Sequence, residues 1–230
     1  MTNMVVLTGA GVSAESGLGT FRDKDGLWTK YDLEEVATPQ GFARNPDLVH
    51  SFYNARRANC LDASPNAAHA ALARLERDYA ANVLIITQNV DDLHERAGSR
   101  NVLHMHGTLA GALCAACAHR WPAPREISSA DPCPACNRPA TRPDIVWFGE
   151  FPYHMDSIET ALTKCDLFAA IGTSGQVYPA AGFVAEAAAA GADTIELNLA
   201  PSDVSDVFDR HLFGPASDIV PAWVQEVLDG

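Results

Sequence analysis

Residues 5–17 have the sequence VVLTGAGVSAESG, in which a short apolar run passes directly into a glycine-rich loop. Three later segments repeat this transition, with apolar runs that end in small or polar residues at 83–89, 167–174 and 194–198. Short apolar runs that alternate with helical segments are typical of buried parallel strands. We therefore expect an α/β fold whose strands end at one edge of a sheet, where such folds bind ligands.

The segments between these runs have helical character. We expect helices at 47–59, 67–79, 156–164 and 180–190, and the Ala, Leu and Glu content of the last two favours them. Residues 111–143 differ, because they are rich in Cys, Pro and Ala and show neither a helical nor a strand period. We expect this stretch to form a compact inserted module that is closed by a metal ion.

Length and charge narrow the class of protein. A chain of 230 residues with 47% apolar content can bury the core of one domain that carries a small module. Its formal net charge of −13 disfavours nucleic acid and anionic membranes as partners, whereas basic peptides are compatible with it. No apolar run reaches the roughly 18–20 residues of a membrane span, and no charged leader precedes residue 5. A soluble, cytoplasmic protein is expected.

The glycine-rich loop is a candidate phosphate-binding element. Gly9 and Gly11 would let the backbone approach a phosphate, and Arg22 further on could neutralise a pyrophosphate. The spacing differs from the G-x-G-x-x-G dinucleotide fingerprint and lacks a Walker lysine. A turn without a ligand, with Arg22 paired to Asp23 or Asp25, remains the alternative.

The cysteine pattern indicates a metal site. Cys114 and Cys117 form one Cys-x-x-Cys pair, and Cys133 and Cys136 form a second pair after fifteen intervening residues. Two such pairs can complete a tetrahedron of thiolates, which is the geometry that zinc prefers. With all four positions filled by cysteine, the metal would be structural, and four unligated thiols are the alternative.

A histidine motif is the candidate catalytic element. His106 directly precedes Gly107 after an apolar run, and its imidazole could act as a base near neutral pH. His104, two residues earlier, should point to the opposite face of an extended segment and is not a substitute. Asn89 and Asp91 lie in a polar loop upstream and could line the same cleft. Structural roles are the alternative: core histidines, and loop caps that bond their own backbone.

Taken together, these motifs resemble those of the sirtuins over essentially the whole chain. The matching stretches are residues 9–17 with 20–22, 87–91, 104–107, the four cysteines, 147–150 and 172–174. The chain is most similar to short bacterial deacylases of the class that also removes acidic acyl groups.

The resemblance implies a doubly wound, Rossmann-like NAD-binding domain formed by residues 1–110 and 144–230. It also implies a small zinc-binding module at 111–143 with one structural Zn²⁺, and a helical lobe from part of 30–65.

The resemblance also implies the binding residues. The positions that match NAD contacts are Gly9, Ala10, Gly11, Glu15, Thr20, Phe21, Arg22, Trp28, Thr87, Gln88, Asn89, Val90, Asp91, Gly172, Thr173, Ser174, Asn198, Leu199, Ala200 and Ala216. The positions that match substrate contacts are Ala37, Tyr53, Arg56, Val146, Phe148 and Gly149. Tyr53 and Arg56 lie three apart and would share one helical face, where they would bind the distal carboxylate of succinyl- or malonyl-lysine. A solvated helix face is the alternative.

The implied activity is NAD-dependent removal of acetyl, succinyl or malonyl groups from lysine in proteins or peptides. NAD would be consumed, with nicotinamide, free lysine and O-acyl-ADP-ribose as products, and His106 would be the general base. Three alternatives stay open: a non-catalytic NAD or ADP-ribose sensor, mono-ADP-ribosyl transfer, and hydride transfer.

Overall fold

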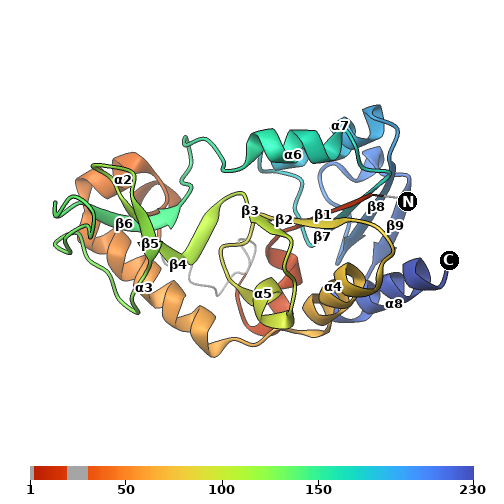
Figure 1. The fold of residues 1–230 in the computed structure, drawn as a ribbon, viewed down its shortest axis with the longest axis horizontal. Coiled ribbons are helices and arrows are strands. Elements are labelled where there is room, and N and C mark those ends of the chain that lie inside the picture. Colours follow the sequence, from red (N-terminus) through yellow and green to blue (C-terminus); the bar gives the residue numbers. More distant parts are fainter. Residues whose placement is uncertain (1–2, 20–30) are drawn as a thin grey trace.

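A six-stranded parallel sheet forms the centre of the computed structural model, which describes residues 3–19 and 31–230. Its strands are β1 (Met4–Thr8), β2 (Val83–Thr87), β3 (Val102–His104), β7 (Leu167–Ile171), β8 (Asp193–Asn198) and β9 (Arg210–Phe213). They lie in the order β3-β2-β1-β7-β8-β9 (Figure 1). Counted along this sheet alone, that order is 3-2-1-4-5-6, which is the Rossmann order. The expected fold class is confirmed.

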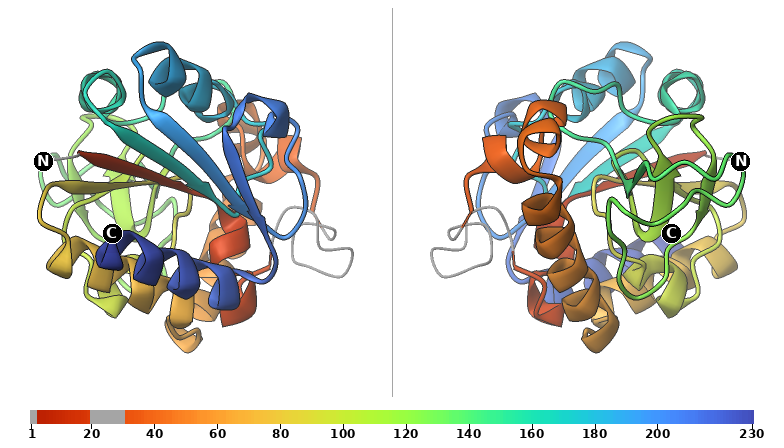
Figure 2. Two further views of the ribbon diagram at one scale, coloured as in Figure 1. Left: turned by 90° about the vertical axis from the view of Figure 1, so that its right-hand side faces the viewer. Right: turned by 90° about the vertical axis from the view of Figure 1, so that its left-hand side faces the viewer.

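Helices cover both faces of this sheet (Figure 2). One face carries α6 (Met155–Leu162), η4 (Ala180–Gly182) and α7 (Phe183–Ala189), and the other carries α4 (Ala67–Asp78) and α8 (Ala216–Asp229). Two short helices, α5 (Leu93–Ala97) and η5 (Ser205–Val207), complete the crossovers.

Alternating side chains on each strand supply the two cores. On β1, Val5 and Leu7 pack with the α6 and α7 side, whereas Met4 and Val6 pack with the α4 and α8 side. Successive strand residues point to opposite faces, so a strand covered on both sides is apolar throughout. This burial explains the continuous apolar runs in the sequence.

A smaller lobe projects from one end of the sheet (Figure 1). It contains the antiparallel strands β4 (Gly107–Cys114), β5 (Arg120–Pro122) and β6 (Thr141–Ile145), in the order β5-β4-β6. Beside them lie the helices α1 (Leu33–Val36), α2 (Pro39–Arg44) and α3 (Pro46–Asp62). A third apolar cluster, which includes Val49, Phe52 and Ile145, joins the helices to this sheet.

Several elements differ from the sequence expectation. Residues 111–143 contain β5, half of β4 and most of β6, and the small sheet extends beyond both ends of that range. Strand β9 and helix α8 were not expected. Within residues 3–19 and 31–230, no helix is long and apolar enough to cross a membrane.

Candidate active site

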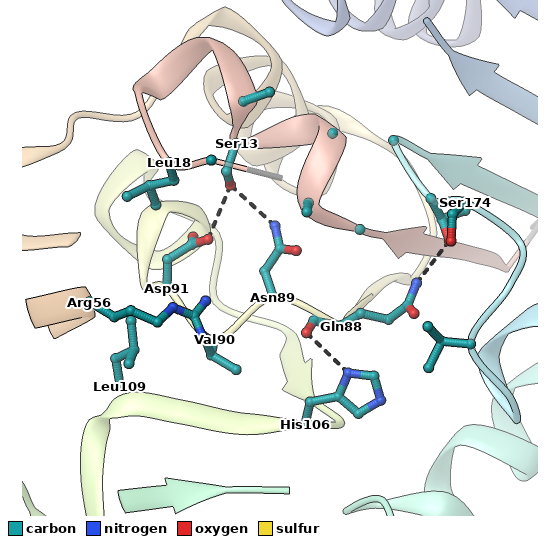
Figure 3. A pocket seen from close by; sticks show the side chains of 18 of the residues that line it. Ser13, Leu18, Arg56, Gln88, Asn89, Val90, Asp91, His106, Leu109 and Ser174 are labelled. Carbon is teal, nitrogen blue, oxygen red and sulfur yellow. Dashed lines mark hydrogen bonds between the residues drawn. The ribbon is translucent and has the colours of Figure 1, made fainter. Parts of the chain in front are cut away.

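A cavity of about 830 Å³ lies between the large sheet and the smaller lobe. The loops that follow β1, β2, β7 and β8 line one side of it, and α3 with the segment after β6 lines the other. The carboxyl ends of parallel strands meet there, as the strand pattern predicted. Figure 3 shows that polar side chains from several of these loops converge in the cavity.

The glycine-rich loop packs closely against the loop that follows β7. The Gly9 and Gly11 amides donate to the carbonyls of Ile171 and Gly172, at 3.0 and 2.8 Å. A Cβ on Gly11 would lie 2.7 Å from the Gly172 Cα, and one on Gly9 would lie 2.8 Å from the Gly172 oxygen. These two glycines are therefore required for contact between two loops of the protein, a reason that the sequence pattern alone did not reveal.

Ser13 connects the two polar residues of the β2 loop. Its hydroxyl donates to Asp91 Oδ2 at 3.1 Å and accepts from Asn89 Nδ2 at 3.1 Å (Figure 3). Asp91 also accepts from the Leu93 amide at 3.2 Å, which is the local loop bond considered as an alternative. Burial raises the pKa of Asp91, and hydrogen bonds from Leu93 and Ser13 oppose that rise. Both side chains are therefore fixed at the cavity wall.

His106 lies in the turn between β3 and β4 and lines the cavity. Its Nδ1 is 3.1 Å from the Gln88 backbone oxygen, which can only accept a hydrogen bond (Figure 3). Nδ1 therefore carries the proton, and Nε2 of the neutral ring is left as an acceptor. Burial lowers the pKa of His106, and the Gln88 carbonyl opposes that shift. The ring is thus neutral near pH 7.

Tyr53 and Arg56 both line the lobe side of the cavity, next to Ala37. Tyr53 is buried, and Arg56 is half-buried with its Cζ 5.9 Å from the centroid of the Tyr53 ring. Figure 3 shows the guanidinium directed into the pocket near Asp91. Burial lowers the pKa of Arg56, and the nearby charges of Tyr53 and Asp91 oppose that shift. Neither side chain lies on the solvated helix face considered as the alternative.

Further hydrogen bonds connect the loops that follow β1, β2, β7 and β8 with one another and with the start of α8. Asn198 Nδ2 donates to the Thr173 backbone oxygen at 2.7 Å, and Gln88 Nε2 is 3.0 Å from the Thr173 hydroxyl. The Glu15 carboxylate accepts from the amide of Ser217 at 2.8 Å and from its hydroxyl at 2.6 Å. Glu15 therefore ties the glycine-rich loop to the first turn of α8.

Most of the expected binding residues lie together around this cavity. Those that line it are Gly9, Ala10, Gly11, Glu15, Ala37, Tyr53, Arg56, Gln88, Asn89, Val90, Asp91, His106, Val146, Phe148, Gly149, Gly172, Thr173, Ser174, Asn198, Leu199 and Ala216. Thr87 and Ala200 are not part of the lining, and the buried Thr87 hydroxyl instead accepts from the Asn89 amide at 3.0 Å. Four expected residues, Thr20, Phe21, Arg22 and Trp28, lie outside the described residues.

Sequence reasoning assigned no side-chain role to two residues whose side chains make contacts here. Ser13 links Asn89 to Asp91, and Trp147 lines the cavity with its indole nitrogen 3.1 Å from the Tyr53 oxygen. Both belong to motifs that were recognised. A motif gives no contact partners, so their specific roles required coordinates.

The four cysteines meet at the outer end of the small sheet. The sulfurs of Cys114, Cys117, Cys133 and Cys136 all lie within 4.8 Å of one another, and two of the sulfur pairs are 3.7 Å apart. Four thiolates at about 2.3 Å from one zinc ion would be separated by about 3.8 Å in a tetrahedron. The backbone amides of Ala116 and Ala135 donate to two of the sulfurs, each at 3.4 Å. The donor set and its spacing fit a structural zinc ion.

Known proteins resemble this chain in sequence and in fold. The sequence model of the Sir2 family matches residues 9–179. An NAD-dependent protein deacylase of Caulobacter vibrioides is 62% identical over 227 residues, which cover 97% of this chain and 95% of that protein. A solved Sir2 homologue in complex with NAD has a TM-score of 0.91 and 41% identity, over 99% of this chain and 90% of the other. A solved Sir2 protein bound to acetylated peptide has a TM-score of 0.85 and 28% identity, over 97% and 92% of the two chains. The chain belongs to the Sir2 family, whose members are called sirtuins.

Proposed function

We propose that this protein is an NAD-dependent protein-lysine deacylase. The observation that carries the proposal is a neutral histidine, His106, whose tautomer is fixed by a backbone carbonyl and which lines a large cavity. Supporting it, the relative from Caulobacter vibrioides is an NAD-dependent protein deacylase, and related solved structures hold NAD and an acetylated peptide.

The polar groups and the size of the cavity fit NAD. About 830 Å³ lies within the usual range for ligand pockets. Asn89 and Asp91, both held by Ser13, would bind the nicotinamide end, and Thr173 and Asn198 would bind the opposite end. When bound, NAD supplies an electrophilic ribose carbon that the acyl oxygen of a modified lysine can attack.

His106 would accept a proton at Nε2 from a hydroxyl group of the bound cosubstrate. The hydrogen bond from Nδ1 to the Gln88 carbonyl holds the ring in position and stabilises the imidazolium that forms. The expected products are nicotinamide, free lysine and O-acyl-ADP-ribose.

We further propose that acidic acyl groups, succinyl and malonyl, are substrates beside acetyl. Arg56 places a cation at the cavity wall, and Tyr53, three residues earlier on α3, lines the same cavity. A guanidinium in a partly desolvated pocket favours an anionic ligand, and its planar donors match a carboxylate. Ala37 leaves room for a longer acyl chain beside them. The substrate backbone would bind along Val146, Phe148 and Gly149 as an added strand.

The remaining parts of the proposal concern architecture. Residues 1–110 and 144–230 would form the NAD-binding domain, and 111–143 a module held by one structural Zn²⁺, with part of 30–65 as the helical lobe. All six cysteines are free of disulfides, which fits a reducing cytoplasm.

The test is to mix the protein with NAD and an acetyl- or succinyl-lysine peptide and to follow all products by mass spectrometry. The unacylated peptide is the control. We expect nicotinamide and O-acyl-ADP-ribose only with acylated peptide. Absence of nicotinamide in every mixture would contradict the proposal, as would nicotinamide release that does not depend on the acyl group.

A further inference from the structure

Trp147 makes a hydrogen bond to one of the two proposed acyl-pocket residues. Its Nε1 donates to the Tyr53 hydroxyl oxygen over 3.1 Å. Both residues line the cavity, although only 1% of Tyr53 and 2% of Trp147 is exposed. The bond is therefore shielded from water, where a hydrogen bond is stronger and its loss costs more.

Neighbouring groups fix the position of the indole ring. The Arg142 Cζ lies 3.5 Å from the centroid of the Trp147 ring, which is a close cation–π contact. Glu150 accepts two hydrogen bonds from Arg142, at 2.7 and 2.9 Å, and a third from the Trp147 amide at 2.9 Å. Trp147 is thus held at its backbone and on its ring face, so its N–H direction is well defined.

This contact determines which way the Tyr53 hydroxyl donates. An indole N–H is a donor only, so the phenol oxygen must accept from it and must direct its own O–H elsewhere. Within residues 3–19 and 31–230, the phenol oxygen has no hydrogen-bond partner besides this indole. Burial raises the pKa of Tyr53, so the phenol stays protonated and remains a donor at neutral pH.

We propose that Trp147 is a specificity-determining residue that orients the Tyr53 hydroxyl, so that its proton is donated to the carboxylate of an acidic acyl group. The inference rests on the proposed acidic-acyl pocket of Tyr53 and Arg56. Trp147 acts here through Tyr53 as a positioning residue, because its single indole N–H is already donated to the Tyr53 oxygen. Acetyl groups carry no distal carboxylate and gain nothing from this orientation.

The test is a double-mutant cycle on the full-length enzyme with its zinc retained. Trp147→Phe removes the N–H and keeps an aromatic ring against Arg142, and Tyr53→Phe removes the hydroxyl. Rates on succinyl and acetyl versions of one peptide are measured for the parent, both single variants and the double variant. Trp121→Phe, at a tryptophan outside the cavity lining, is the matched control. Benzothienylalanine at position 147, which keeps the two-ring shape without the N–H, covers the case of a poorly folded Phe variant.

We expect Trp147→Phe to lower the succinyl-to-acetyl ratio of kcat/KM by about threefold to tenfold, through KM for succinyl peptide. In the Tyr53→Phe background the same change should leave this ratio within about 1.5-fold, because the hydroxyl is already absent. Equal losses on both peptides, or an undiminished effect without the hydroxyl, would overturn the orienting role while the acidic pocket stands. A parent without succinyl activity, or an unchanged ratio in Tyr53→Phe, would overturn the pocket and this inference together.

Discussion

His104 and His106 are two residues apart, yet their surroundings give them different chemistry. Burial alone would lower the pKa of His104, but its hydrogen bond to Glu95, at 2.7 Å, and the charge of that carboxylate raise the pKa above its ordinary value. His106 has no such partner among the described residues, and burial lowers its pKa. A neutral imidazole that lines the cavity suits a general base, whereas an imidazole that is paired with a carboxylate and does not line the cavity suits it less.

His106→Ala should abolish deacylation while folding and NAD binding persist. A positioned base contributes on the order of a hundred- to ten-thousand-fold, so kcat should fall by about that factor. Because the pKa of His106 is lowered, the active neutral form prevails above it, and parent activity should be lost only below about pH 6.5. Peptide assays across pH 5–8, with calorimetric NAD titration as the folding control, test this. Residual activity within about tenfold of the parent would exclude His106 as the base.

Tyr53→Phe combined with Arg56→Met should impair succinyl peptide selectively. The two changes remove the hydroxyl and the charge while keeping most of the side-chain volume on the cavity wall. We expect the KM for succinyl peptide to rise steeply. The corresponding loss of binding free energy is about 1.5–3 kcal/mol, which is the range for hydrogen bonds to charged groups. Acetyl peptide turnover should stay within a few-fold. Parallel losses on the two peptides would contradict an acidic-acyl pocket.

Strands β4 and β6 link the cysteine cluster to the cavity. Strand β4 starts at Gly107, directly after His106, and ends at Cys114, which is one of the four thiols. Strand β6 pairs with it and leads into the proposed substrate segment that begins at Val146. A Cβ on Gly107 would lie 2.1 Å from the Asp144 oxygen, so the two strands meet too closely there for any larger residue. A disturbance at the thiols can therefore reach both the base and the substrate segment.

Cys114→Ser should lower stability and activity together. Zinc binding free energy is also folding free energy for a module that has few apolar residues of its own, so a lost ligand should loosen the ends of β4 and β6. Elemental analysis should find one zinc per parent chain and less in the variant, with a lower Tm by calorimetry. Cys165→Ser, at a buried thiol outside the cluster, should keep the zinc. Parent protein without zinc, when purified without chelators, would refute the assignment.

The sequence predicted the elements that are buried on both faces better than those at the edges. Strand β7 was expected at residues 167–171 and has those bounds, because two covered faces require an unbroken apolar run. Strand β9 is an edge strand of four mostly exposed residues, so it carries no such signal. Helix α8 contains Pro221, which breaks the pattern of a helix in sequence. The strands of the small lobe were missed because residues 111–143 are rich in turn-forming residues.

The sequence motifs predicted which residues line the cavity, but they did not predict which residues these side chains and loops contact. Sequence order placed Gly9, Gly11 and His106 at strand ends, where parallel sheets bind ligands. The contact of Gly11 with Gly172 joins loops 161 positions apart, and no local pattern reports it. The bond between Trp147 and Tyr53 likewise crosses the lobe. Long-range pairing is therefore the part that the sequence left undetermined.

Across the whole molecule, two buried histidines should make the fold sensitive to acid. His69 and His94 lie with ring centroids 5.0 Å apart beneath the polar loops, and burial lowers their pKa values to about 4 and about 3. The unfolded chain binds these protons near pH 6.5, so it binds more protons than the native state between about pH 6.5 and pH 4. Stability therefore falls as the pH drops through this window.

The expected loss between pH 7 and pH 5 is about 3–4 kcal/mol in the free energy of unfolding for the two histidines together. Urea unfolding at both pH values measures it, and His94→Gln should reduce the pH dependence by about half. Gln keeps a polar group near the Thr8 hydroxyl, which lies 3.0 Å from His94 Nε2, so the core bond need not be lost. His119→Gln, at an exposed histidine, is the matched control. If His94→Gln and the parent lost equal stability on acidification, the acid sensitivity would have to come from the carboxylates instead.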